Sequence, residues 1–208
     1  MTEALSFIHR FEPGASTEPP LLLLLHGTGG DESDLVPLGQ MIAPDATMLS
    51  PRGKVLENGM PRFFRRLADG VFDEDDVRRR AADLADFIAA ARGHYRLAAP
   101  IALGYSNGAN TAAAVLLLRP EALAGAILLR ATLPLSETAP VDLTGKPVLI
   151  LSGATDPMMS PDRAARLASV LQGYGAAVEH RTLRSGHEVS QTDVTLAQQW
   201  LKAHAPAS

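Results

Sequence analysis

The stretch Gly104–Gly108, Gly-Tyr-Ser-Asn-Gly, is the feature that most restricts how this chain can fold. It follows a short apolar run, Ile101–Leu103, that suits a buried strand, and it precedes residues 109–118, which suit a helix rich in small side chains. In this strand–turn–helix context the pattern G-x-S-x-G is typical of a sharp turn that lifts a serine hydroxyl clear of a sheet. An ordinary glycine turn is the alternative. The flanking strand and helix favour a nucleophilic Ser106 at the positive end of the helix.

Apolar segments alternate with helical patterns along the chain, which predicts βα units in a mostly parallel, doubly wound sheet flanked by helices. Leu21–Leu25 lacks polar alternation and is expected to be a central strand buried on both faces. Further strands are expected at residues 46–50, 101–103, 124–129, 148–151 and, as a later edge strand, 178–183. Helices are expected at residues 73–92, 161–172 and 192–203. A first hairpin strand is expected before a surface turn at Pro13–Pro20, and Pro51–Gly70 is expected to be a long functional loop.

The length of 208 residues fits one domain, residues 1–208, with a full core and no room for a large lid. A formal net charge of −4 and a pI near 5.8 argue against nucleic acid or an anionic membrane as the main partner. The longest leucine run is too short to cross a bilayer, and the first residues lack a signal-peptide pattern. We therefore expect a cytoplasmic protein without membrane insertion. The absence of cysteine excludes disulfides, thiolate metal sites and a cysteine nucleophile.

Asp156 is the candidate for the acid of a serine-based catalytic triad. A serine nucleophile needs a histidine base and an acid that orients the base. In doubly wound hydrolase sheets the three residues come in the order serine, acid, histidine, each after a strand. Asp156 lies just after the expected strand 148–151, at the end of the sheet where such folds place their chemistry. The alternative is a loop or capping aspartate. Asp142 precedes its strand and lies at the wrong end.

His187 is the candidate base among six histidines. It directly follows the expected strand 178–183 and comes after both Ser106 and Asp156 in the chain. The other five are in the wrong order, inside a strand or in the tail: His9, His26, His94, His180 and His204. A solvated loop histidine is the alternative for His187.

The run His26–Gly30, His-Gly-Thr-Gly-Gly, follows the first central strand and matches a glycine-rich loop that supplies an N–H group to an oxyanion hole. Asn107, directly after the serine, would supply the second N–H. A phosphate-binding loop would need Gly-Lys-Ser/Thr, and a dinucleotide fingerprint would need glycine at position 32, which is Glu32. His26 itself is interpreted as structural, holding the loop by hydrogen bonds.

These motifs together resemble the small α/β-hydrolase carboxylesterases of the phospholipase/carboxylesterase group. Four segments carry the resemblance: Leu23–Gly30, Gly104–Gly108, Gly153–Pro157 and Ser185–His187. A fifth segment, Pro51–Arg66, resembles a bacterial subgroup of hydrolases and carboxylesterases linked to methylhydroquinone resistance. The similarity runs from about residue 7 to residue 202.

The resemblance implies an α/β-hydrolase fold in its minimal form and a triad of Ser106, Asp156 and His187. It also implies an oxyanion hole made by the backbone amides of Thr28 and Asn107, with the loop at 62–64 over the cleft. Many members of the family carry glutamine after the serine, where this chain has Asn107. The role of the backbone N–H is unaffected by that difference.

Four side chains are candidates for substrate binding: Arg62, Phe63, Phe64 and Met158. The aromatic rings and Met158 could line an apolar pocket, with ordinary core packing as the alternative. The arginines at positions 62, 65 and 66 could bind a carboxylate or phosphate substituent. Their alternative is a solvated surface cluster that pairs with the acidic residues 73–76.

The sequence thus predicts a serine carboxylesterase that hydrolyses small or short-chain esters through an acyl-enzyme intermediate. This chemistry needs no metal or organic cofactor, and the expected partner is a small-molecule ester. A thioesterase, a lysophospholipase-like enzyme and a small-molecule sensor with slow turnover remain alternatives. A homodimer is compatible with the sequence, which leaves the oligomeric state open. A quinone-related role rests on the resemblance alone.

Overall fold

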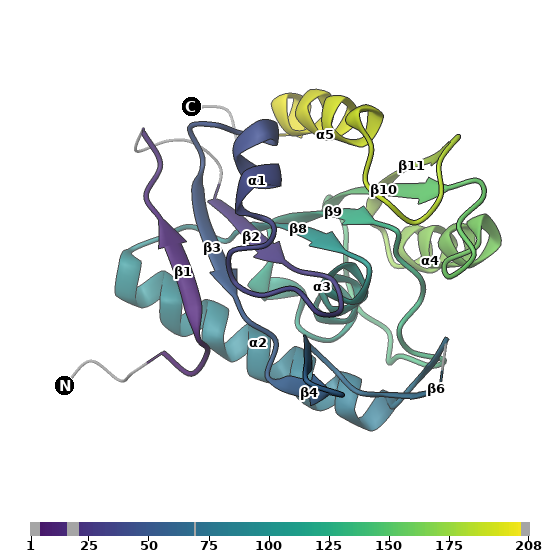
Figure 1. Cartoon of the computed structure of the whole chain (residues 1–208), viewed down its shortest axis with the longest axis horizontal. Coiled ribbons are helices and arrows are strands. Elements are labelled where there is room, and N and C mark those ends of the chain that lie inside the picture. Colours follow the sequence, from purple (N-terminus) through teal and green to yellow (C-terminus); the bar gives the residue numbers. More distant parts are fainter. Residues whose placement is uncertain (1–4, 16–20, 69, 205–208) are drawn as a thin grey trace.

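A computed structural model describes residues 5–15, 21–68 and 70–204 of the chain (Figure 1). Its centre is a seven-stranded sheet in the order β1-β3-β2-β8-β9-β10-β11. The strands are β1 (His9–Glu12), β2 (Leu21–Leu25), β3 (Thr47–Pro51), β8 (Ile101–Tyr105), β9 (Gly125–Leu129), β10 (Pro147–Gly153) and β11 (Ala177–Leu183). Every neighbouring pair is parallel except β1 with β3. The predicted mostly parallel sheet is confirmed, with β11 at one edge.

Helices cover both faces of this sheet (Figure 1). One face carries α1 (Val36–Ile42) and α5 (Gln191–His204). The other carries α2 (Glu74–Tyr95), α3 (Asn107–Leu118) and α4 (Pro161–Gly173), and a short 3₁₀ helix, Pro120–Ala122, precedes β9. The helices expected from apolar spacing lie within three residues of these bounds. Helix α1 was not predicted, because seven residues with a proline near the start give too short a periodic pattern.

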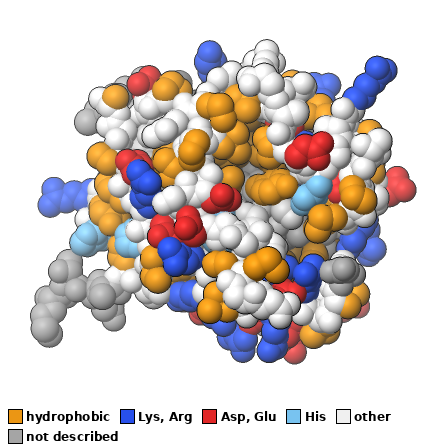
Figure 2. Space-filling view, in the orientation of Figure 1, with side chains coloured by type: hydrophobic (Ala, Val, Ile, Leu, Met, Phe, Trp, Pro, Cys, Tyr) orange, Lys and Arg blue, Asp and Glu red, His pale blue; other side chains and the backbone are white. Residues whose placement is uncertain are grey.

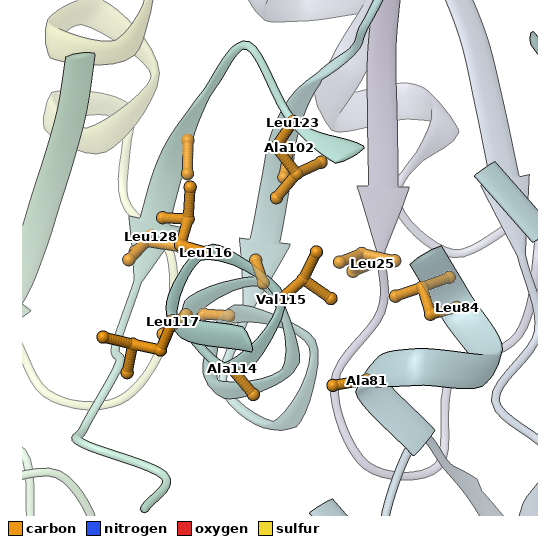
Figure 3. Close-up of a cluster of buried hydrophobic side chains, with 14 of the residues drawn as sticks. Leu25, Ala81, Leu84, Ala102, Ala114, Val115, Leu116, Leu117, Leu123 and Leu128 are labelled. Atoms are coloured by element: carbon orange, nitrogen blue, oxygen red, sulfur yellow. The ribbon is translucent and has the colours of Figure 1, made fainter. Parts of the chain in front are cut away.

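Strand β2 shows how the two layers share the core. Leu21, Leu23 and Leu25 face the larger apolar cluster under α2, α3 and α4, whereas Leu22 and Leu24 face the cluster under α1 and α5. The expectation that this strand is buried on both faces is therefore confirmed. Figure 3 shows Val115 of α3 pointing toward Leu25 of β2, with Leu84 of α2 beyond Leu25. Gly108 at the start of α3 has no side chain toward β2, which lets this end of the helix lie close to the sheet.

The segment after β3 is more ordered than the long loop that we expected. It forms two small hairpins, β4 (Val55–Glu57) with β5 (Met60–Arg62), and β6 (Arg66–Ala68) with β7 (Val71–Phe72). Asn58 and Gly59 both have positive φ, 52° and 80°. This is the conformation that a two-residue hairpin turn requires, and Asn-Gly is its preferred sequence. The local signal was present in the sequence.

Strand β1 does not form the expected hairpin with β2. It pairs antiparallel with β3, since β2 already has β3 and β8 as its two neighbours. The turn expected at Pro13–Pro20 lies partly outside the described residues. No helix in the described part of the chain combines the length and apolar character needed to span a membrane.

Candidate active site

Ser106 occupies a sharp turn between the end of β8 and the start of α3. Its backbone has φ 51° and ψ −112°, and its N–H donates to Leu129 O at 2.9 Å. A Cβ at Gly108 would lie 2.0 Å from Leu25 O, and a Cβ at Gly104 would lie 2.7 Å from the Ala109 backbone. Glycine is therefore required on both sides of the serine. A non-glycine residue at this φ costs about 1–3 kcal/mol, which the surrounding packing must offset.

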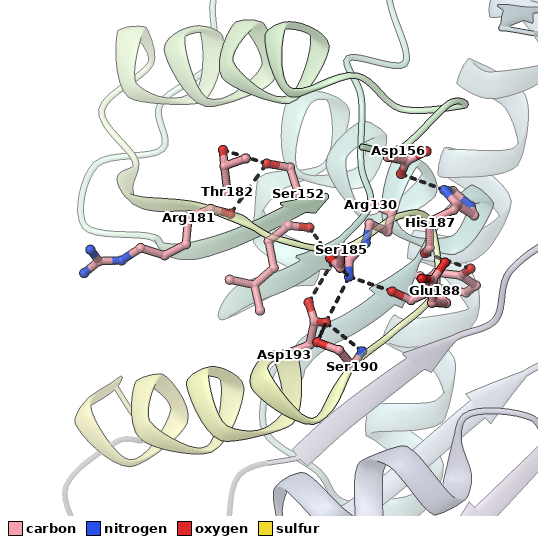
Figure 4. Close-up of polar contacts among 12 residues, drawn as sticks. Arg130, Ser152, Asp156, Arg181, Thr182, Ser185, His187, Glu188, Ser190 and Asp193 are labelled. Carbon is pink, nitrogen blue, oxygen red and sulfur yellow. Dashed lines mark hydrogen bonds and ion pairs between the residues drawn. The ribbon is translucent and has the colours of Figure 1, made fainter. Parts of the chain in front are cut away.

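Two hydrogen bonds connect Ser106, His187 and Asp156. His187 Nε2 lies 3.0 Å from Ser106 Oγ, and His187 Nδ1 lies 2.8 Å from Asp156 Oδ2. Asp156 Oδ1 accepts from the backbone N–H groups of Met158 and Met159 at 2.8 and 2.9 Å, so both carboxylate oxygens are held. With Nδ1–H directed at the carboxylate, Nε2 is free to accept the serine proton. The structure thus brings together the three residues selected from the sequence (Figure 4 shows Asp156 and His187).

Thr28 and Asn107 line the same cavity as Ser106. The backbone N–H of neither residue donates to an acceptor within the described ranges, whereas the next amide, Gly29 N–H, is bonded to Pro61 O at 2.9 Å. Two uncommitted N–H groups beside a serine hydroxyl are what an oxyanion needs.

His26 fixes the loop that carries Thr28. Its Nδ1 donates to Gly27 O at 2.7 Å, and its Nε2 accepts from Gly53 N–H at 3.0 Å. Burial lowers the pKa of His26, which keeps the ring neutral and able to accept. The structural role expected for this histidine agrees with these contacts.

The cavity has a volume of about 440 Å³. Of the residues proposed for substrate binding, Arg62 and Met158 line it, and Phe63 and Phe64 do not. Both phenylalanines are fully buried in the core, with the Phe63 ring 4.7 Å from that of His26 and the Phe64 ring 5.1 Å from that of Phe72. Their placement on the pocket wall is corrected, because two adjacent large rings gain more by packing into the core. Phe72 reaches the cavity instead.

Asn107 also holds the backbone of this segment. Its Oδ1 accepts from Phe63 N–H at 2.8 Å, which ties the start of α3 to the β5–β6 connection. Its buried Nδ2 has no hydrogen-bond partner within the described residues. The side chain after the serine therefore positions one wall of the cavity.

The three neighbouring arginines have different surroundings. Arg65 is exposed and pairs with Asp73 on the surface, as the solvated alternative predicted. Arg62 is almost fully buried, and Arg62 and Arg66 both pair with Glu57 at 3.2 and 2.7 Å. Figure 2 shows basic and acidic side chains side by side along the lower rim, where Figure 1 places α2. This rim is a mixed-charge surface.

Arg130 was not predicted from the sequence, yet it holds the loop that carries His187. It follows β9, has φ 57° and is completely buried. Its guanidinium donates to Gly186 O at 3.0 Å and to Glu188 O at 2.7 Å, the carbonyls on either side of His187. Further bonds run to Ser185 Oγ and Leu151 O. Figure 4 shows this guanidinium between the loop and α5.

Asp193, on α5, is the counterion of Arg130. The two side chains form a bidentate pair at 2.7 and 2.9 Å, and both are almost completely buried. Burial opposes ionisation of Asp193, but the bonds from Arg130 and Ser190 outweigh it and hold the pKa of this carboxyl below its ordinary value. From the sheet side, Tyr105 donates its hydroxyl to His187 O at 3.1 Å. The histidine loop is therefore fixed from β8, β9 and α5.

Comparison with known proteins shows which family the chain belongs to. The family described as Phospholipase/Carboxylesterase matches residues 8–205. The chain belongs to this family. It is 44% identical to the putative hydrolase MhqD of Bacillus subtilis over 196 residues, which is 93% of this chain and 97% of that protein. The resemblance inferred from the motifs is confirmed.

Solved structures give the same result. A carboxylesterase of Bacillus cereus superposes with a TM-score of 0.94 at 41% identity, and the match covers 97% of this chain and 96% of that one. A carboxylesterase of Mesorhizobium loti has a TM-score of 0.91 at 34% identity, with 96% of each chain covered. The α/β-hydrolase fold and an esterase-type serine hydrolase are thus established for this chain.

Proposed function

We propose that the protein is a carboxylesterase that hydrolyses small, short-chain carboxylic esters, with Ser106 as nucleophile, His187 as base and Asp156 as the acid that orients it. The observation that carries the proposal is the continuous path of hydrogen bonds from Ser106 Oγ through the imidazole to the Asp156 carboxylate, at 3.0 and 2.8 Å. Family membership supports the class of reaction.

In the first step His187 Nε2 removes the hydroxyl proton as Ser106 Oγ attacks the ester carbonyl. The carbonyl oxygen becomes an oxyanion, which the N–H groups of Thr28 and Asn107 stabilise. The imidazolium then gives its proton to the leaving alcohol, and the acyl group remains on the serine. Asp156 keeps Nδ1 protonated and stabilises the charge on the ring.

In the second step a water molecule takes the place of the alcohol. His187 removes a proton from this water, whose oxygen attacks the acyl carbon, and the acid leaves as Ser106 recovers its proton. The cavity of about 440 Å³ lies in the range of sites for small ligands. It therefore favours short acyl groups over long alkyl chains.

The test is hydrolysis of p-nitrophenyl esters from acetyl to decanoyl by the wild-type protein, Ser106→Ala and Ser152→Ala. The control is matched, since Ser152 Oγ also contacts a histidine, His180 Nε2 at 2.9 Å, but is buried in β10 and does not line the cavity. We expect turnover of short esters to be lost in Ser106→Ala and kept in Ser152→Ala. Full activity in Ser106→Ala would refute the mechanism, and a decanoyl optimum would refute the substrate size.

Covalent labelling by a fluorophosphonate provides a second readout that does not depend on the choice of ester. Wild type and Ser152→Ala should be labelled, and Ser106→Ala should not. Absence of both turnover and labelling in the folded wild-type protein would remove the triad assignment.

A further inference from the structure

Arg163 lies at the start of α4, and its side chain reaches the wall of the cavity that contains Ser106. It is half-buried, and Nη2 donates to Gly70 O at 3.1 Å. That is the single hydrogen bond of this side chain to the described part of the chain, in which no carboxylate lies within ion-pair distance of the guanidinium. A guanidinium carries five N–H donors. Most of the donor capacity of Arg163, and its charge, are therefore available to a ligand.

The other arginines of this cavity have a different role. Arg62 and Arg66 are both paired with the carboxylate of Glu57, so their charge is already engaged by the protein. No aspartate or glutamate of the described chain lines the cavity, whose charged lining consists of these three arginines. Of these three, Arg163 is the one that no described carboxylate pairs with, and its charge favours a negatively charged ligand over a cationic one.

The positive charge of Arg163 is unfavourable for the stability of its helix. It is the third residue of α4, where the partial positive charge of the helix end repels a cation, and Asp162 is the one acidic residue of that turn. Pro161 begins the helix, so the end is well defined. The charge of Arg163 therefore does not stabilise the helix, but it is well placed to bind an anion in the cavity.

A second cavity of about 280 Å³ adjoins the first and shares Gly70, Phe72 and Arg163 with it. It adds Arg166, one turn further along α4. Glu74 also lines this second cavity, but its carboxylate accepts from Ser136 N–H and Oγ at 2.9 and 3.1 Å. Arg163 therefore lies on the wall shared by the two cavities, and Arg166 lies on the wall of the second cavity, which Ser106 does not line.

Apolar side chains form part of the wall of the cavity that Ser106 and Arg163 both line: Phe72, Pro157, Met158 and Met159. A substrate that fills the space thus needs an ester carbonyl at Ser106, a short hydrocarbon segment, and an anionic group at Arg163. The acyl group stays on the enzyme between the two steps, so a fixed anchor is most useful on that part of the substrate.

We propose that Arg163 binds a carboxylate on the acyl part of the substrate, which makes monoesters of dicarboxylic acids the preferred substrate class. This rests on the proposed function, because it places the ester carbonyl at Ser106. A guanidinium binds a carboxylate through paired hydrogen bonds, which fixes orientation as well as charge.

The experiment compares kcat/KM for monoethyl glutarate, adipate and suberate with that for ethyl pentanoate, hexanoate and octanoate, which have the same chain lengths with a methyl in place of the carboxylate. Turnover is followed by alkali uptake in a pH-stat. Wild type, Arg163→Gln and Arg181→Gln are measured at low and high NaCl. Glutamine at position 163 keeps a donor for Gly70 O. Arg181 on β11 is the matched control, since its loss removes one charge outside both cavities.

For at least one chain length, we expect the wild-type protein to prefer the anionic ester over its neutral counterpart by about tenfold, the size of one charge-assisted hydrogen bond. Arg163→Gln should remove this preference and Arg181→Gln should keep it. High salt should weaken the preference, because the site is half exposed.

A wild-type protein that hydrolyses the neutral esters, and favours no monoester at any chain length, overturns the inference while the proposed function stands. That comparison needs no variant, so it decides the question even if Arg163→Gln fails to fold. An unchanged preference in folded Arg163→Gln also overturns it. Failure of the proposed function would look different: no turnover of any ester and no fluorophosphonate labelling of Ser106.

Discussion

Replacing Arg130 by methionine should reduce both stability and turnover. The substitution keeps an unbranched side chain of similar length and removes the guanidinium. Asp193 then remains almost completely buried, with Ser190 as its remaining hydrogen-bond donor. The carbonyls of Gly186 and Glu188, on either side of His187, lose their donor as well.

The expected loss of stability follows from the burial of the ion pair between Arg130 and Asp193. Breaking a buried ion pair by removing one partner costs about 3–5 kcal/mol, because an uncompensated charge stays in the interior. A domain of this kind has about 5–15 kcal/mol of stability in total, so the variant should remain folded but unfold at much lower denaturant. Turnover should fall by more than the unfolded fraction explains. A displacement of the His187 ring of about 1 Å would cost on the order of 10²-fold.

The assay is a double-mutant cycle with Arg130→Met, Asp193→Asn and the combined variant. Unfolding in urea is followed by fluorescence of Trp200, the single tryptophan, which is buried on α5. The combined variant should be more stable than the sum of the single losses predicts, by about 0.5–3 kcal/mol, since neither charge is then unpaired. Strictly additive losses, or a folded Arg130→Met with unchanged kcat, would refute the reasoning.

Three further predictions concern the rest of the site. Gly108→Ala should destabilise the fold and abolish turnover, because the added Cβ would lie 2.0 Å from Leu25 O. The control is Gly93→Ala on α2, where an added Cβ contacts nothing, and this variant should raise Tm slightly in thermal unfolding. Asp156→Asn should lower kcat on the order of 10⁴-fold with the fold intact by circular dichroism, and near-normal kcat would contradict the orienting role. Burial lowers the pKa of His26, so the stability that its neutral form contributes is complete above pH 6.5 and is lost as pH falls through the lowered pKa. When the pH is lowered from 7.5 to 5, Tm should therefore fall less in His26→Gln than in the wild-type protein. An equal fall in both proteins would contradict this reasoning.

Most of the sheet, and Ser106 with its partners His187 and Asp156, could be predicted because their signals are local. A run of five apolar residues such as Leu21–Leu25 favours a strand buried on both faces, and order along the chain selects one histidine. The hairpin at Asn58-Gly59 also had a local signal, which the expectation of a long loop obscured.

The remaining features depend on contacts that no local pattern records. Phe63 and Phe64 are adjacent, and nothing in the sequence indicates whether they or Phe72 face the cavity. The role of Arg130 was equally hidden, because in the sequence an arginine that follows a strand resembles a surface residue. Its partners lie 21 to 63 residues away in the sequence and become neighbours only in the folded sheet.

The pair between Arg130 and Asp193 also affects when activity can arise during synthesis. Ser106, Asp156 and His187 all precede α5 in the chain, but the loop around His187 is held by an anchor on that helix. A domain generally folds as a unit, which requires the elements that complete its core to have been synthesised. A nascent chain lacking α5 would contain all three residues without holding the base in place. Turnover measured during translation would therefore report when this helix docks.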